Sequence, residues 1–290
     1  MDLEKYKALL TAIDEGSLSA AAKKLDYTPS GISRMIAALE EENGFRLLKR
    51  KHEGVIPTEE CNLMLPAIRQ LIAAGENCRQ LSAQIRGSDI GTVIVGTAYN
   101  AYYIWLAKMI AQFQRVYPNI SVQIKNGYSS QLLKMMEQKQ LDICLISQRE
   151  GEHGWLPICR DPMMALLSEN HPLTKLERFP IEYFEHEPYI TTYPGMDVDS
   201  ARVFAKCAIC PNTQITTTDS IATCSMVEAG LGVTMNNRVN AMSWKGKIKA
   251  IPLFPEQIVE IGIAHDYEPT PAAKRFLEFI KPHLNELISE

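Results

Sequence analysis

Hydroxyl and basic side chains gather in two short segments of the first sixty residues, where they could bind nucleic acid. One segment is Thr28-Pro-Ser-Gly-Ile-Ser-Arg34, and the other, from Arg46 to Lys51, holds four cations. Lysine and arginine bind phosphates, and arginine also recognises guanine edges in the major groove. These residues therefore predict a DNA-binding surface, with contacts from Thr28, Pro29, Ser30, Gly31, Ser33, Arg34, Arg46, Lys49, Arg50 and Lys51.

The bulk composition neither contradicts nor reveals such a surface. The formal net charge is −4, which excludes a protein that coats nucleic acid through its total charge but allows a local basic patch. Hydrophobic residues (46%) and charged residues (22%) are typical of a globular protein. The apolar runs are too short for a bilayer, and the start, Met1-Asp-Leu-Glu-Lys5, does not resemble a signal peptide. We expect a cytoplasmic protein without a membrane partner.

A second group of polar residues follows predicted strands or begins predicted helices in the later part of the chain. In open α/β sheets, ligands bind at the carboxyl ends of strands, where helix N-termini present N–H groups. Hydroxyls in such places suit a small carboxylate or another small anion. The alternative is that these are only helix caps and strand residues. The predicted effector-binding residues are Tyr99, Asn100, Ser129, Ser130, Ser147, Gln148, Thr191 and Thr192.

Motifs for catalysis are not found in the sequence. It has no phosphate-binding loop, no Gly-x-Ser-x-Gly and no HExxH, so we predict neither an enzyme nor a cofactor or metal site. Cys207 and Cys210 could form a redox pair that switches a regulator, or could simply pack before Pro211. A cytoplasmic small-molecule binding protein or an enzyme on the later part of the chain is the alternative from another class.

The elements that must position the DNA-binding residues are short helices. Apolar residues at helical spacing predict one helix up to Ile13 and another over Ala20–Leu25. Thr28 is a suitable N-cap for a third helix that ends near Gly44. A basic, glycine-containing stretch then predicts a hairpin up to Thr58. This order predicts a winged helix-turn-helix over residues 1–58, the alternative being a small helical domain with a solvated basic loop.

A long helix is predicted over residues 59–87. Its apolar residues form a narrow stripe, typical of a coiled-coil seam, in which Gly75 would let two helices approach closely. The alternative is a helix that packs on its own later domain. The stripe consists of Met64, Ile68, Leu71, Gly75, Cys78, Leu81 and Ile85.

The remaining residues, 88–290, alternate between strand-like and helix-like segments, which is typical of βαβ units on a parallel sheet. The expected strands are 92–97, 121–125, 142–147, 163–168, 189–192, 214–218, 232–235 and 260–264. The expected helices are 102–116, 129–138, 199–207, 221–229 and 271–287.

The N-terminal motifs closely resemble the LysR-type transcriptional regulators. Glu15-Gly-Ser-Leu-Ser-Ala-Ala-Ala-Lys-Lys-Leu25 is similar to the family's e-x-G-S-f-s-x-A-A-x-x-L. Ser33-Arg-Met-Ile-Ala-Ala-Leu-Glu-Glu-Glu-Asn-Gly-Phe-Arg-Leu-Leu-Lys-Arg50 is similar to its S-x-x-I-x-x-L-E-x-x-x-G-x-x-L-F-x-R, with Leu48 in place of phenylalanine. The resemblance implies that the third helix and Arg50 of the wing contact DNA.

The later part resembles that family's effector domain more weakly, in phrases such as Phe113-Gln-Arg-Val-Tyr-Pro118 and Val227-Glu-Ala-Gly-Leu-Gly232. The resemblance implies two α/β lobes around a cleft, lobe one being residues 88–161 with 267–290 and lobe two being residues 162–266. It also implies a homodimer or homotetramer formed through the long helix. The expected partners are double-stranded DNA, a second copy of the chain, a small-molecule effector and RNA polymerase.

Overall fold

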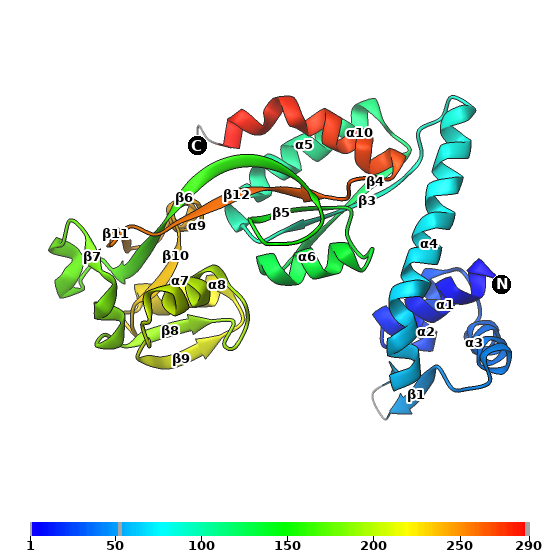
Figure 1. The fold of residues 1–290 in the computed structure, drawn as a ribbon, viewed down its shortest axis with the longest axis horizontal. Coiled ribbons are helices and arrows are strands. Elements are labelled where there is room, and N and C mark those ends of the chain that lie inside the picture. The colour runs from blue at the N-terminus through cyan, green and yellow to red at the C-terminus, as the bar shows by residue number, and fades with distance from the viewer. Residues whose placement is uncertain (1, 52–53, 288–290) are drawn as a thin grey trace. The chain divides into compact units, whose positions relative to one another are not determined.

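A computed structural model describes residues 2–51 and 54–287 of the chain. Its elements form two units, one built on residues up to Gly91 and the other on residues from Thr92 onward, with residues 138–140 grouped with the first. Figure 1 shows the first unit as mainly helical and the second as an α/β domain. No helix in the described ranges is long and apolar enough to cross a membrane.

The first unit begins with three helices, α1 (Leu3–Asp14), α2 (Leu18–Lys24) and α3 (Pro29–Asn43). The predicted cap of the third helix is confirmed, because Thr28 accepts a hydrogen bond from the amide of Gly31. Ser17 caps α2 in the same way, by accepting one from the amide of Ala20. Gly44 has φ +79°, in the left-handed region, and ends α3. Local side-chain hydrogen bonds therefore set the starts of α2 and α3, and a glycine sets the end of α3.

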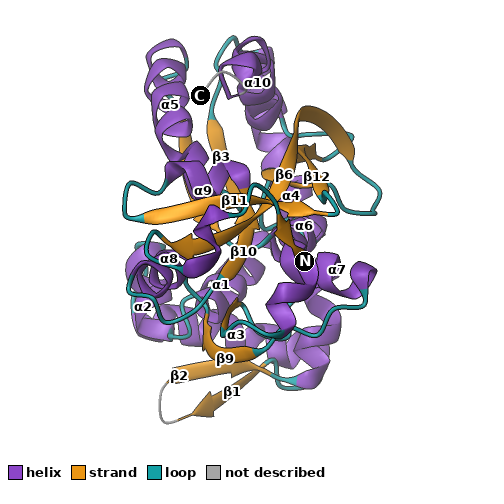
Figure 2. Cartoon of the chain, turned by 90° about the vertical axis from the view of Figure 1, so that its left-hand side faces the viewer, coloured by secondary structure: helices purple, strands orange, loops and turns teal. Residues whose placement is uncertain are grey.

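A two-stranded wing follows α3, with β1 (Leu48–Lys51) antiparallel to β2 (Gly54–Pro57). Figure 2 shows the two strands side by side. The amide of Val55 donates to the carbonyl of Gly16 (2.8 Å), which ties β2 to the turn between α1 and α2. Gly54 has φ +137°, and a Cβ there would lie 2.1 Å from the Gly16 carbonyl oxygen, so this approach requires glycine.

The long helix α4 (Glu59–Ile85) uses part of its apolar stripe within its own chain. Ile68 is buried in the core of the first unit, and Met64 and Leu71 pack against that core. Gly75 faces Leu3 of α1, because an added Cβ would lie 3.0 Å from its Cδ1. Gly75 therefore lets two helices of the same chain, α4 and α1, approach closely, and the seam with a second copy stays a prediction. The end of the stripe is exposed, at Cys78, Leu81 and Ile85.

The second unit is an α/β domain with one large curved sheet, in the strand order β4-β3-β5-β12-β6-β11-β7 with β10 also paired to β6. A separate parallel pair, β8 and β9, accompanies it. The strands are β3 (Gly91–Thr97), β4 (Ile120–Asn126), β5 (Ile143–Ser147), β6 (Gly154–Ser168), β7 (Phe179–Pro180), β8 (Tyr189–Thr192), β9 (Thr213–Thr217), β10 (Thr234–Asn237), β11 (Ile248–Phe254) and β12 (Ile258–His265). The α-helices are α5 (Tyr103–Val116), α6 (Ser129–Glu137), α7 (Asp199–Cys207), α8 (Ser220–Glu228), α9 (Arg238–Ser243) and α10 (Pro271–Ile280).

Two hydrophobic cores define the two lobes. In lobe one, α5 and α10 cover one face of the sheet of β3, β5 and β12, and α6 covers the other. In lobe two, α7 packs against β7, β10 and β11, and α8 packs on β8 and the second half of β6. Figure 1 shows β6 and β12 running from one lobe toward the other.

The sheet pairing corrects the expected lobe boundaries. Strand β12 pairs along its length with residues 154–162 of β6, and its residues 261–265 also pair with β5, so residues 258–265 belong to the sheet of lobe one. We expected this segment in lobe two (162–266), because the crossing strand was not recognised as part of the first sheet. The last three residues of the range 267–290 assigned to lobe one lie outside the described residues.

Three further features were not predicted. β6 is one strand of 15 residues, whereas the sequence predicted only its end, residues 163–168. The short helix α9 and strand β11 were missed, since α9 lacks a side-chain cap and β11 contains Pro252. The sheet is also not purely parallel, because β12 runs antiparallel to both of its neighbours.

Candidate nucleic-acid interface and ligand cleft

The N-terminal turn of α3 presents small polar side chains and one cation to solvent. Ser30 and Arg34 are exposed. Thr28 has a structural role as well, because its Oγ1 accepts from the Gly31 amide (3.1 Å) and lies 3.2 Å from the Ser30 hydroxyl. Eight of the ten predicted DNA-binding residues are exposed, and two are half-buried, namely Gly31 and Ser33.

Glu40 connects α3 to the wing. Its Oε1 accepts from the amides of Leu47 (2.8 Å) and Leu48 (3.2 Å), and its Oε2 accepts from Nη1 of Arg46 (2.8 Å). Burial opposes ionisation, but these two amides and the guanidinium hold the pKa of Glu40 below its usual value. Part of the predicted basic patch is therefore paired internally, while Lys49, Arg50 and Lys51 are exposed along β1.

A cavity of about 270 Å³ lies between the two lobes of the second unit. Four of the predicted effector-binding residues line it: Tyr99, Asn100, Ser129 and Thr192. They come from the ends of β3 and β8 and from the first residue of α6, as the strand-end rule predicts. The sequence missed the contribution of the segment at the end of β10 and in α9, which adds Asn236, Asn237 and Asn240.

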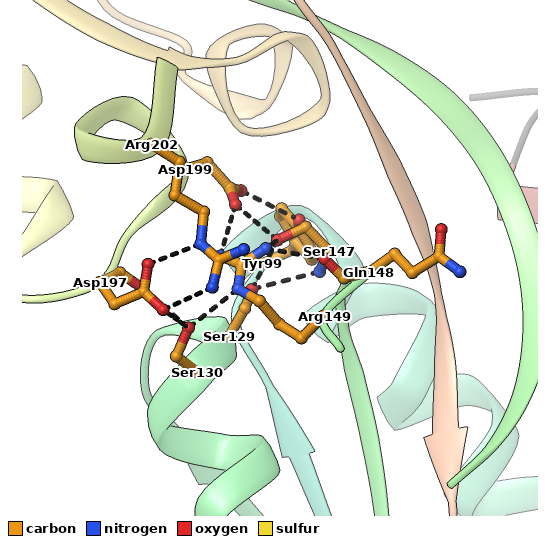
Figure 3. A network of polar contacts seen from close by, with 9 residues as sticks. All are labelled: Tyr99, Ser129, Ser130, Ser147, Gln148, Arg149, Asp197, Asp199 and Arg202. Atoms are coloured by element: carbon orange, nitrogen blue, oxygen red, sulfur yellow. Dashed lines mark hydrogen bonds and ion pairs between the residues drawn. The ribbon is translucent and has the colours of Figure 1, made fainter. Parts of the chain in front are cut away.

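The other four predicted residues lie elsewhere. Ser130 and Ser147 belong to a polar network beside the cavity, and the side chain of Gln148 points away from that network (Figure 3). The hydroxyl of Thr191 lies 2.7 Å from that of Thr213 on the neighbouring strand, and Thr191 is not among the lining residues. Neighbouring side chains on a strand point to opposite faces, so Thr191 and Thr192 could not both face one cavity.

The chemistry of the cavity wall is that of neutral hydrogen-bonding groups. Carboxamides, hydroxyls and tyrosines predominate, Asp199 and Asp219 are its charged residues, and none of the described lining residues is Lys, Arg or His. Asn237 is buried, and within the described ranges its Nδ2 donor has no hydrogen-bond partner. A buried donor that makes no hydrogen bond is costly to the fold.

Beside the cavity, Arg149 and Asp199 join the two lobes (Figure 3). Arg149 follows β5 in lobe one, and its Nη2 lies 2.7 Å from Oδ1 of Asp199, the first residue of α7 in lobe two. The same Asp199 oxygen accepts from the hydroxyl of Ser147 (2.5 Å). The remaining guanidinium donors reach the hydroxyls of Ser130 and Ser147 and the carbonyl of Gln148, at 2.8, 2.8 and 3.0 Å. The side chain of Arg149 is buried and that of Asp199 nearly so, at 5% and 11% exposed.

A second pair, Asp197 with Arg202, lies on the solvent side of this network. Two short hydrogen bonds from Arg202 hold the pKa of Asp197 at about 2, although both side chains are about half exposed. Ser130 donates to Asp197 as well, at 2.7 Å, which adds another contact between the lobes. Sequence reasoning missed Arg149, Asp197 and Asp199, although the position of Arg149 just after a predicted strand end could have indicated it.

Asp161 lies where β6 passes from one lobe to the other, and its burial makes the stability of the domain depend on pH. It is 3% exposed, and burial raises its pKa to about 6 although the amide of Val239 donates to it (3.2 Å). A raised folded-state pKa means that the folded protein gains stability as pH falls from about 7 toward 4, by at most about 3 kcal/mol. We expect Asp161→Asn to remove this gain in thermal unfolding of the second unit, while Glu278→Gln, an exposed change, keeps it. An unchanged pH profile in Asp161→Asn would contradict the prediction.

The cysteines are all free thiols. Cys207 is half-buried against the core of lobe two, whereas Cys210 is exposed and its amide donates to Glu185 (3.0 Å). The redox alternative therefore rests on the sequence spacing alone.

Two family models match the chain. Residues 3–62 match a model described as a bacterial regulatory helix-turn-helix protein of the lysR family, and residues 86–285 match the LysR substrate binding domain. Among curated proteins, the HTH-type transcriptional regulator YvbU of Bacillus subtilis is 24% identical, over 97% of this chain and 98% of that protein. The HTH-type transcriptional regulator SsuR of Burkholderia cenocepacia is also 24% identical, over 99% and 96%.

Solved structures share the fold over the full length. A full-length OxyR variant from Pseudomonas aeruginosa has a TM-score of 0.71 at 20% identity and covers 98% of both chains. Full-length CbnR in complex with its target DNA has a TM-score of 0.63 at 17% identity and covers 97% of this chain and 99% of CbnR.

Proposed function

This chain belongs to the LysR family of bacterial transcriptional regulators, and from that premise we propose which residues bind DNA and which bind the effector. It is a DNA-binding regulator with a C-terminal effector-binding domain. We propose that α3 enters the major groove with Ser30, Ser33 and Arg34 toward the bases, and that the wing follows the phosphates. The observation that carries this is the exposed turn of α3 beside the exposed cations of β1.

The effector site is the cavity between the lobes, and we propose a small polar molecule with an acceptor group as its occupant. The unpartnered Nδ2 of Asn237 supports an acceptor there. The N-terminal residues of α6 and α8, Ser129 and Ser220, also line the cavity, and helix N-termini favour a carboxylate or another anion. We propose that the domain binds this molecule without converting it.

The assembly we propose is a dimer, or a pair of dimers, through the exposed part of α4. The side chains of Leu81 and Ile85 are 45% and 87% exposed. Exposed apolar side chains at helical spacing favour packing against a partner helix. Two copies would place two DNA-binding units on one two-fold DNA site. Contact with RNA polymerase and a cytoplasmic location follow from regulation of transcription and belong to the same proposal.

Neighbouring threonines on β8 provide a matched test of the cavity. Thr192 lines the cavity and its hydroxyl lies 2.6 Å from that of Thr223, whereas the hydroxyl of Thr191 contacts Thr213. In a thermal-shift screen of small metabolites, a compound that stabilises the full chain identifies an effector. We expect Thr192→Val to require about ten times more of that compound for the same stabilisation, which corresponds to the loss of one polar contact. Thr191→Val should keep it.

DNA binding without the compound should be the same in both threonine variants. A loss of the compound's effect in Thr191→Val alone would place the effector outside the cavity.

A further inference from the structure

We propose that Asp199 is an internal occupant of a carboxylate-binding site in lobe one, and that a carboxylate effector must displace it. The site, here called the carboxylate cradle, consists of Tyr99, Ser147 and Arg149. This inference rests on the proposed function of the cleft and adds how the cleft is regulated.

The contacts of Asp199 are those of a bound ligand. Its carboxylate receives Nη2 of Arg149 at 2.7 Å, the Ser147 hydroxyl at 2.5 Å and the Tyr99 hydroxyl at 3.5 Å. All three donors come from lobe one, but Asp199 is on α7 of lobe two. One lobe therefore supplies a complete set of donors, and the other supplies the anion that they hold (Figure 3).

The cradle is held in place by lobe one itself. Ser129 Oγ accepts from the amide of Ser147 (3.1 Å), and the two serine hydroxyl oxygens lie 2.9 Å apart, so that Ser129 can donate to Ser147. The guanidinium of Arg149 is fixed by Ser130 and by the carbonyl of Gln148. These contacts do not depend on Asp199. The donors therefore stay in place when that carboxylate leaves, which is the arrangement expected of a preorganised anion site.

From the cavity between the lobes, a free carboxylate can reach Arg149 only after Asp199 moves. Ser129, Tyr99 and Asp199 all line the cavity, so Asp199 separates the cavity from Arg149. The guanidinium is buried, and a buried cation without a partner is strongly unfavourable. An effector that brings its own carboxylate can compensate this cost, whereas a neutral ligand cannot. Displacement of Asp199 would also remove the ion pair between the lobes and so change their closure.

Chemical rescue tests this directly in the full chain. Asp199→Ala removes the carboxylate and leaves space the size of formate. We expect this variant to unfold roughly 5–10 °C below the wild type. Sodium formate should restore most of that loss in a saturable way, with sodium chloride keeping the ionic strength constant. Hydrogen exchange of residues 128–133 and 196–203 should become faster in the variant and slow again with formate.

Three controls separate the cradle from general effects of anions. Asp199→Asn fills the space with a neutral group and should show no rescue. The double variant Arg149→Met/Asp199→Ala lacks the cation and should show none. Asp219→Ala removes the other carboxylate of the cavity wall. Among the described residues, Oδ1 of Asp219 accepts from the backbone amides of Ile221 and Ala222. Formate should not raise the thermal stability of this variant more than chloride does.

A formate effect in Asp199→Ala no larger than that in Asp199→Asn overturns the proposal. If Asp199→Ala does not fold, equal hydrogen exchange of residues 196–203 in Asp199→Asn and wild type overturns it. Failure of the proposed function is a different result: formate rescues Asp199→Ala, but no small molecule stabilises the wild type. If a carboxylate stabilises the wild type but formate does not rescue Asp199→Ala, the proposed effector site is supported and the proposed role of Asp199 is rejected.

Discussion

Arg34→Ala should reduce the affinity for specific DNA by about 10- to 100-fold for each DNA-binding unit, because an arginine that contacts a guanine contributes about 1–3 kcal/mol. Arg34 is exposed on the first turns of α3, the position from which a recognition helix reaches base edges. The measurement is binding to DNA selected from a random library by the wild-type chain. Specific and nonspecific affinities should converge in the variant.

Two control variants accompany Arg34→Ala. Lys49→Ala, on β1, should weaken binding to all sequences alike and lower the salt dependence by about one unit, as expected of a phosphate contact. Arg115→Ala, an exposed change on α5, should have no effect on DNA binding. Wild-type sequence preference in Arg34→Ala would show that α3 does not recognise the bases.

Glu40→Ala should destabilise the wing by about 2–4 kcal/mol, since the amides of Leu47 and Leu48 both lose their acceptor. The wing would then be wrongly placed against α3, and DNA affinity should fall about tenfold or more. Because the pKa of Glu40 is lowered, its contribution is present above about pH 4.3 and is lost as pH falls below that value. Hydrogen exchange of residues 47–51 and 54–58 measures the effect.

Glu41→Ala, the exposed neighbour, is the matched control and should change stability by less than about 0.5 kcal/mol. Glu40→Gln keeps one acceptor oxygen and should lie between the two. Equal hydrogen exchange in Glu40→Ala and wild type would mean that the wing is held by other contacts, such as that between Val55 and Gly16.

The sequence predicts the first unit well because its boundaries depend on local chemistry. Thr28, Pro29 and Gly44 determine where α3 begins and ends through contacts a few residues away. The helix that approaches Gly75 could not be predicted, for the opposite reason. Its neighbour Leu3 lies far away in the sequence, and a helical stripe does not reveal which helix covers it.

The cleft could be predicted only in part, for a related reason. The rule about strand ends identifies Tyr99, Asn100 and Ser129, because a side chain at a strand end has a known direction. It cannot identify Asp199 or Asn237, since their positions depend on how lobe two folds against lobe one. The ion pair with Arg149 joins residues fifty positions apart, and neither residue carries a local signal of the other.

The continuous strand β6 limits how this domain can be divided. Its first half is hydrogen-bonded to β12 in lobe one, and its second half is hydrogen-bonded to β10 and β11 in lobe two. A cut in the second connection between the lobes, residues 255–257 between β11 and β12, would therefore leave them joined through β6. Neither lobe can be transplanted into a relative without taking half of a strand from the other. In this chain the sensor is a single exchangeable part, and new effector specificity must arise by substitution around the cleft rather than by exchange of a lobe.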